Sequence, residues 1–274
     1  MALSAALNEV FAANRAVGRI EFAVKASGGV TRRSHVREEG PLRLRCPGPP
    51  SQELEAVIVN TAGGVAGGDR LALDLSVAPG AHLAVTTAAA EKIYRSLAAD
   101  SVIEVKLKVA AGGSLAWLPQ ETILFDSARL ARTIHVDLAD DARLIFAEAV
   151  VFGRIGMGET VQDGCLQDRW QIHRAGRILH AEALWLNGDI AQKLEQGAIA
   201  NGGRAMATLV AIPGDDAVVA AVRALEFSGE AAASAWKGMM VVRLCAADGA
   251  ALRSDLIAVL STLRGSSLPR LWLN

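Results

Sequence analysis

The sequence has few aromatic residues, few cysteines and no long apolar run. Aromatic residues make up 4% of the chain, with one tyrosine, so the aromatic groove in which a polysaccharide hydrolase stacks sugars is not expected. The three cysteines are far apart and form no CxxC pair, which argues against a disulfide framework and a structural zinc site. No stretch approaches the roughly 20 consecutive apolar residues of a membrane-spanning helix, so we expect a soluble chain.

The charges are nearly balanced. The formal net charge is −1 and the sequence pI is about 6.5, so the broad positive field that attracts nucleic acid is missing. The first residues have no basic stretch ahead of apolar ones, and Glu9 and Arg15 interrupt their apolar pattern. They do not resemble a secretory signal, so we expect a cytoplasmic protein with no nucleic-acid or membrane partner.

A strand, turn and second strand repeat through the middle of the chain. Apolar and polar residues alternate over residues 71–77, 102–109 and 130–138. Each stretch runs into similar punctuation (VAPGAHL, VAAGGSL, LADDARL and, less closely, IHRAGRIL) and then into a second strand, at intervals of about 30 residues. Gly80, Gly112 or Gly113, and Gly176 supply the positive φ of such turns, and Asp140 and Asp141 tolerate it nearly as well.

These units predict a mostly β fold, a β-solenoid-like or layered stack of hairpins, with a small helical C-terminal part. An ordinary β-sandwich whose turns share their chemistry by chance is the alternative. Helical patterns occur at 217–227, after an Asp able to cap the first turn, and at 250–263, and a strand is expected at 239–244. Because no Pro/Ser-rich linker divides the chain, we expect one domain over 1–274, with the β-stack at about 20–210 and a strand–helix cap at about 211–274.

The glycine-rich stretch at 60–71 (NTAGGVAGGDRL) invites comparison with nucleotide-binding loops. A strand and not a helix is expected after it, and neither GK[ST] nor GxGxxG is present. We therefore predict a tight loop in which Asp69 caps backbone amides.

A cluster of Glu91, Lys92, Tyr94 and Arg95 follows at 86–96 (TTAAAEKIYRS). Tyr and Arg are frequent at interfaces, so an interface or an internal polar network is the leading interpretation and a solvated loop the alternative. Catalysis is disfavoured because no nucleophile, base and orienting group accompany the cluster.

Carboxylates recur along the repeats. Glu121 and Asp126 flank an apolar core, and Glu148 and Glu182 occupy related places in later repeats (FAEAV, HAEAL). If the repeats stack, these side chains could line a ladder or a polar channel. Hard or borderline metal ions favour carboxylate oxygen, and Ni²⁺ also accepts imidazole and thiolate ligands. For any single Glu, protection of a strand edge is the alternative.

The remaining polar motifs indicate no catalytic, cofactor or metal residue. Arg154 and Glu159, in GRIGMGE, are expected to form a structural salt bridge. The five histidines occur singly, although His173 and His180 could converge across one hairpin. Cys46 is expected to be a buried small residue, with a soft nickel ligand as the alternative.

Seven motifs in order carry a family resemblance: GPLRL, NTAGGVAGGDRL, TTAAAEKIYRS, LPQETILF, GRIGMGE, WQIHRAGRILHAEALWLNG and LPRLW. Together they resemble the urease accessory protein D family, called H in some organisms, over nearly the whole chain. Ala88 departs from the pattern, because the family commonly has Gln there.

The resemblance implies a β-rich protein without catalytic activity that acts as a chaperone in assembly of the urease metallocentre. Its implied partners are the urease subunits and the urease accessory proteins F and G. Nickel would be bound only in transit, GTP would be bound only by the partner GTPase, and a polar tunnel through the protein is one implied route for nickel.

Overall fold

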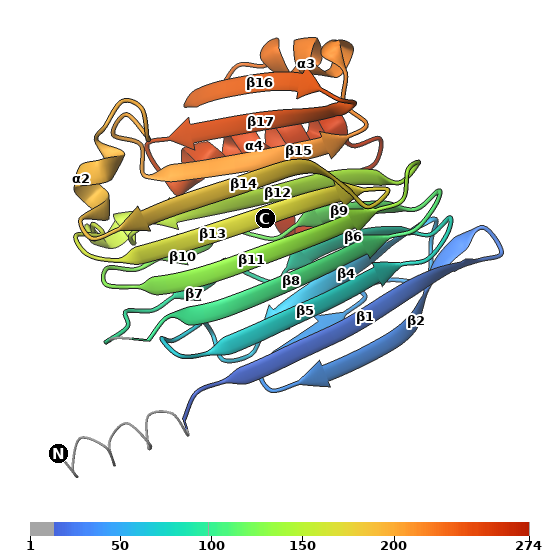
Figure 1. The fold of residues 1–274 in the computed structure, drawn as a ribbon, viewed down its shortest axis with the longest axis horizontal. Helices are drawn as coiled ribbons and strands as arrows, with labels where there is room; N and C mark the ends of the chain where they lie inside the picture. Colours follow the sequence, from blue (N-terminus) through green and yellow to red (C-terminus); the bar gives the residue numbers. More distant parts are fainter. Residues whose placement is uncertain (1–13, 98, 274) are drawn as a thin grey trace.

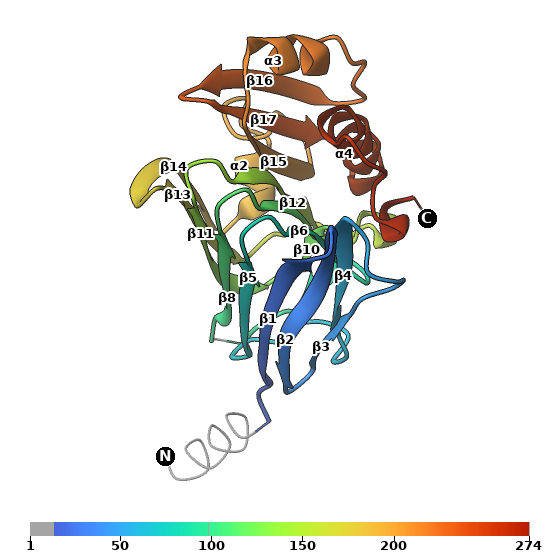
Figure 2. The ribbon, with the colours of Figure 1, turned by 90° about the vertical axis from the view of Figure 1, so that its right-hand side faces the viewer.

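The computed structural model describes residues 14–97 and 99–273, and its strands form two facing sheets (Figures 1 and 2). Sheet A has seven strands, in spatial order β14 (Arg177–Asn187), β13 (Cys165–Arg174), β11 (Arg129–Leu138), β8 (Ser101–Val109), β5 (Arg70–Val77), β1 (Val17–Ser27) and β2 (Val30–Glu39). Sheet B has ten, namely β16 (Glu230–Trp236), β17 (Met239–Ala246), β15 (Ala205–Ile212), β12 (Arg143–Phe152), β9 (Ser114–Leu118), β6 (His82–Thr87), β4 (Glu53–Asn60) and β3 (Leu42–Arg45), with β10 (Thr122–Leu124) and β7 (Glu91–Ile93) off this path.

The centre of each sheet is a parallel stack, which confirms the mostly β, solenoid-like prediction. Strands β1, β5, β8, β11 and β13 are parallel in sheet A, and β4, β6, β9 and β12 are parallel in sheet B. Each repeat therefore contributes one strand to each sheet and then rises to the next level.

The prediction that each repeat is a hairpin is wrong for the first three repeats, because their two strands belong to different sheets. In the first three repeats the strands on either side of the turn do not pair with each other; β5 pairs with β1 and β8, while β6 pairs with β4 and β9. Both strands of a repeat carry an apolar face, and these faces meet across the space between the sheets. The last repeat differs, because β13 and β14 form a true antiparallel hairpin.

The turns follow glycine chemistry where expected. Gly80 and Gly112 have φ of 66° and 64°, a region that favours glycine. The third turn departs from the prediction, since neither Asp140 nor Asp141 takes a positive φ. Instead the Asp141 carboxylate accepts a hydrogen bond from the Gly112 amide at 3.0 Å and so joins two successive turns.

Two apolar cores share sheet B. The larger lies between the sheets, and the second lies between the outer face of sheet B and helices α3 (Asp216–Arg223) and α4 (Gly249–Leu263). Asp215 and Asp248 cap these helices by accepting from the amides of Val218 and Ala251. Trp272, in the 3₁₀ turn η2 (Arg270–Trp272), is buried in the second core, and its indole donates to the Leu118 carbonyl at 3.0 Å.

The C-terminal segment extends one sheet more than the other. The predicted helices and the strand at 239–244 are present, although the first helix ends at Arg223 and not at 227. Strands β15, β17 and β16 continue sheet B past the last strand of sheet A, β14, as Figure 2 shows. No helix within the described residues is long and apolar enough to cross a membrane.

Candidate functional site

A buried ion cluster lies between the sheets near this end of the stack. Arg132 on β11 and Asp168 on β13 come from sheet A, and Glu148 on β12 faces them from sheet B. The Arg132 Nε lies 2.9 Å from Asp168 Oδ1, and the two terminal guanidinium nitrogens bind Asp168 and Glu148. No member exposes more than 5% of its surface, so one cation is held between two carboxylates away from water.

Two tryptophans complete the cluster. The Trp117 indole donates to Glu148 at 2.8 Å, and the Trp170 indole donates to Asp168 at 2.8 Å. Burial raises the pKa of Glu148 even though Arg132 opposes the shift. For Arg132, burial alone would lower the pKa, but Asp168 and Glu148 together raise it above its ordinary value, so the guanidinium stays charged.

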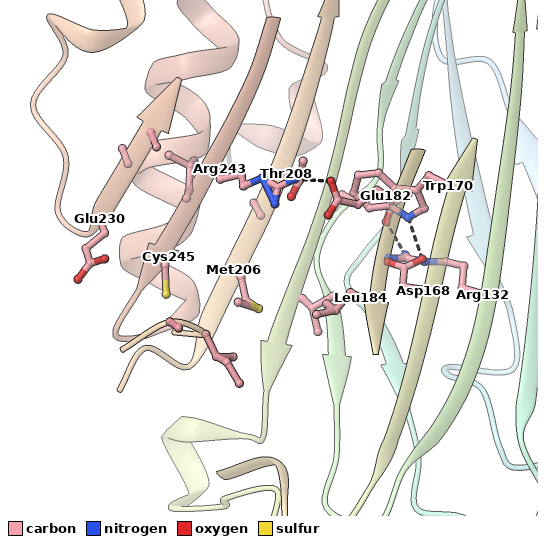
Figure 3. A pocket seen from close by; sticks show the side chains of 18 residues that line it. Arg132, Asp168, Trp170, Glu182, Leu184, Met206, Thr208, Glu230, Arg243 and Cys245 are labelled. Atoms are coloured by element: carbon pink, nitrogen blue, oxygen red, sulfur yellow. Dashed lines mark hydrogen bonds and ion pairs between the residues drawn. The ribbon is translucent and has the colours of Figure 1, made fainter. Parts of the chain in front are cut away.

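The cluster forms the inner wall of a cavity of about 360 Å³ between the diverging sheets (Figure 3). Its outer part is formed by β14 on one side and by β15, β17 and β16 on the other. Arg243 on β17 reaches across to Glu182 on β14 at 2.6 Å. Four carboxyl groups and two guanidinium groups line the cavity, which gives it an excess of acidic groups: Arg132, Glu148, Asp168, Glu182, Glu230 and Arg243.

The carboxylates expected to form one row divide between three places. Glu148 and Glu182 line the same cavity, although they lie in opposite sheets. Glu121 pairs instead with Arg253 of α4 at 3.1 Å. Asp126 accepts from two loop amides, those of Gln162 and Asp163, at 2.8 and 3.1 Å. A single continuous ladder is therefore not formed.

The glycine-rich loop is held as predicted. The Asp69 carboxylate accepts from the Ala66 amide within the loop and from the Ala16 amide, both at 2.8 Å. Gly64 has a φ of 155°, and a Cβ there would lie 2.4 Å from the Tyr94 ring. The loop is thus a packed structural element between neighbouring strands.

The cluster at 86–96 divides into an internal half and an exposed half. Glu91 accepts from the Asn60 amide at 3.2 Å, and the Tyr94 hydroxyl donates to the Gly63 carbonyl at 2.9 Å, so both support the glycine-rich loop. Lys92 and Arg95 are exposed. Burial raises the pKa of Glu91 to about 7.

The raised pKa of Glu91 predicts a pH effect on stability. The pKa of the unfolded carboxyl is near its ordinary value of 4.5, whereas the folded carboxyl holds its proton to about pH 7. Stability that is present below pH 4.5 is therefore lost as the pH rises through 7. Glu91→Gln, which stays neutral, should therefore gain about 1 to 3 kcal/mol over the parent chain at pH 8 and little at pH 4.5, measured by urea unfolding.

Glu159→Gln is the opposite control for this measurement. Its carboxylate accepts from the Arg154 guanidinium at 2.8 Å, which lowers the pKa of Glu159, so its contribution is present above pH 4.5 and the variant should lose stability at pH 8. An equal pH response of both variants would contradict the assignment to Glu91.

The Arg154–Glu159 pair is a structural salt bridge, as predicted. The guanidinium binds both oxygens of Glu159 and stacks on the Phe125 ring 4.4 Å from its centre. The Tyr94 ring packs against the Phe125 ring in a T-shaped arrangement, with the ring centres 5.3 Å apart. The pair fixes the loop around the 3₁₀ turn η1 (Ile155–Met157) to the glycine-rich region.

The histidines and cysteines form no ligand set. His173 and His180 do not face each other across their hairpin, because a register shift places them opposite Ile178 and Ile172. Burial raises the pKa of the Cys46 and Cys245 thiols, which keeps them protonated near neutral pH. Within residues 14–97 and 99–273, no three His, Cys, Asp or Glu side chains are grouped as metal ligands.

The sequence interpretation overlooked the centre of the cavity. Arg132 and Asp168 occupy inward positions of alternating strands, in register with Leu130, Ile134 and Trp170. A charged residue at an apolar position of such a pattern was the available signal, since a buried charge requires a partner.

Comparison with known proteins gives the same family as the motifs. The family model described as UreD urease accessory protein matches residues 16–273. The chain belongs to the UreD urease accessory protein family. Two relatives named urease accessory protein UreD, from Rhodopseudomonas palustris strains BisA53 and CGA009, are each 52% identical over 97% of this chain and over 93% and 96% of their own lengths.

A UreD protein of Bradyrhizobium diazoefficiens is 49% identical over 97% of both chains. These relatives are named as accessory proteins and not as enzymes. Membership of the UreD family implies a role in urease maturation.

Proposed function

We propose that this chain is a non-catalytic scaffold that binds apo-urease together with urease accessory proteins F and G and takes part in nickel insertion. Nickel is cargo in transit, and GTP belongs to the partner GTPase. The cytoplasm is the proposed site of action. The exposed side chains of Lys92 and Arg95 are proposed partner contacts.

The observation that supports nickel transfer is the acid-rich cavity between the sheets. Its carboxylate oxygens suit a divalent cation, and the thioether sulfur of Met206 lies on the same walls. The Glu182–Arg243 pair spans the outer part of the cavity, and the Arg243 side chain is 56% exposed. Because exposed ion pairs contribute about 0 to 1 kcal/mol, an incoming cation could displace Arg243 at low cost.

Glu182→Gln tests this proposal. The variant replaces a carboxylate of the cavity by a neutral amide of the same shape. Urease matured with it should therefore contain several-fold less nickel and show correspondingly lower activity. Both quantities are measured on urease purified from cells that supply all accessory proteins. Co-purification of this chain with its partners should not change.

Glu159→Gln is the matched control, because Glu159 also pairs with an exposed arginine and its side chain is 15% exposed, against 16% for Glu182. Normal nickel content with Glu182→Gln would remove the cavity from the proposal. Failure of the parent chain to associate with urease or with accessory proteins F and G would overturn the scaffold role.

A further inference from the structure

The edge of sheet A at β14 is open and carries little protection against strand pairing. In the part of the chain that the structure describes, β14 pairs with β13 alone, and its residues Glu182 and Leu184 line the cavity. Ile178 and Trp185 on this strand are 57% and 71% exposed. Edge strands with exposed apolar side chains are templates for another strand.

The opposite edge of sheet A shows what protection looks like in this protein. Strand β2 (VTRRSHVREE) carries five charged residues among its ten. Strand β14 (RILHAEALWLN) has a single charged residue, Glu182, after its first position. Both strands are edges of the same sheet, and β14 is the one with fewer charged residues.

Sheet B provides a surface on which an added strand could pack. Strands β15, β17 and β16 continue past β14, and helices cover their outer face. On the inner face Met206, Thr208, Ala232 and Cys245 line the cavity, and Arg243 of β17 reaches from this face to Glu182 of β14. A strand added to β14 would lie over these residues and complete the second layer.

We propose that this groove binds one extended peptide segment of a partner protein, which adds a strand to β14. The segment carries alternating side chains, apolar and basic ones facing the groove, because Glu182 and Glu230 give its walls an excess of acid. The proposal rests on the scaffold function and specifies how one partner is held.

A second copy of this chain does not fit the groove. Antiparallel pairing of two β14 edges about a two-fold axis keeps the same face of both sheets on one side. The three protruding strands of each copy would then occupy the same layer. The groove accommodates a single segment and not a folded sheet.

Hydrogen exchange of the reconstituted complex tests the proposal. The purified chain is compared alone and with apo-urease and accessory proteins F and G. Every second backbone amide of β14 points to the unpaired edge of the strand. These amides should exchange at least about tenfold more slowly in the complex, because strand addition gives them carbonyl partners. A complex that forms while these amides exchange unchanged overturns this inference and leaves the scaffold function intact.

Two further outcomes also overturn it. Absence of any complex removes the scaffold function and this inference together. Slower exchange of β14 in the chain alone, increasing with its concentration, would assign the edge to self-association.

Leu184→Lys and Val36→Lys form a matched pair of variants. Both parent residues are half-buried apolar side chains that pack against the same core from the two edge strands of sheet A. Lysine at 184 places a cation where the incoming segment would lie, so affinity for the partner complex should fall about tenfold or more. Val36→Lys should leave affinity unchanged, and equal loss in two variants that keep the parent circular dichroism spectrum would contradict the proposal.

Discussion

Arg132→Met is expected to lower the free energy of unfolding by about 3 to 5 kcal/mol. The substitution removes the cation that Glu148 and Asp168 share and leaves two carboxylates buried side by side. Their mutual repulsion and lost hydration cost more than the volume change. Urea unfolding at neutral pH measures the effect.

A compensated variant separates charge from packing. Adding Glu148→Gln and Asp168→Asn to Arg132→Met removes all three charges, and the Trp117 and Trp170 indoles still have oxygen acceptors. Most of the lost stability should return, since replacing a whole buried ion cluster is often neutral. If the triple variant is as unstable as Arg132→Met, the cluster acts through shape and not through charge.

Arg243→Met provides the exposed counterpart. Arg243 also binds a carboxylate of the cavity, but its side chain is 56% exposed. Its loss should cost about 0 to 1 kcal/mol, because water replaces the ion pair. A loss as large as that of Arg132→Met would mean that the mouth of the cavity is closed to water.

Trp272→Ala is the second large expected effect, a loss of about 3 to 5 kcal/mol. The ring is 1% exposed, its indole donates to the Leu118 carbonyl at 3.0 Å, and the Arg253 guanidinium lies 5.1 Å from its centre. Truncation leaves a cavity and removes the indole donor from the Leu118 carbonyl. Because Trp272 anchors the chain end against sheet B and α4, its loss should also increase proteolysis of the last residues.

Trp185→Ala is the control for tryptophan removal as such. Trp185 is 71% exposed on β14, so its truncation should change the free energy of unfolding by about 0.5 kcal/mol or less. Similar losses at positions 185 and 272 would contradict the packing described for the second core.

The sequence predicts the local structure well because its signals are local. Alternation locates β5, β8 and β11, the glycines at 80 and 112 locate two turns, and Asp215 begins a helix where capping chemistry places it. Strand pairing is harder to predict from the sequence. A strand–turn–strand unit has the same alternation whether its halves pair with each other or with the next level.

The candidate site was only partly predictable for a related reason. Glu148 and Glu182 are visible as carboxylates in similar short motifs, but their meeting across two sheets depends on how the repeats stack. Arg132 was hidden among expected surface charges of an alternating strand, although it falls at an inward position. Asking whether each charged residue falls at an inward or an outward position of its alternating strand would have identified it.

The parallel stack also fixes how far apart the two ends of the protein stand. Each level adds one strand to each sheet, and neighbouring strands lie about 4.8 Å apart. Gain or loss of one level would therefore move the open β14 edge relative to the charged β2 edge by one such step while leaving both edges intact. The length of the stack therefore changes only by whole levels.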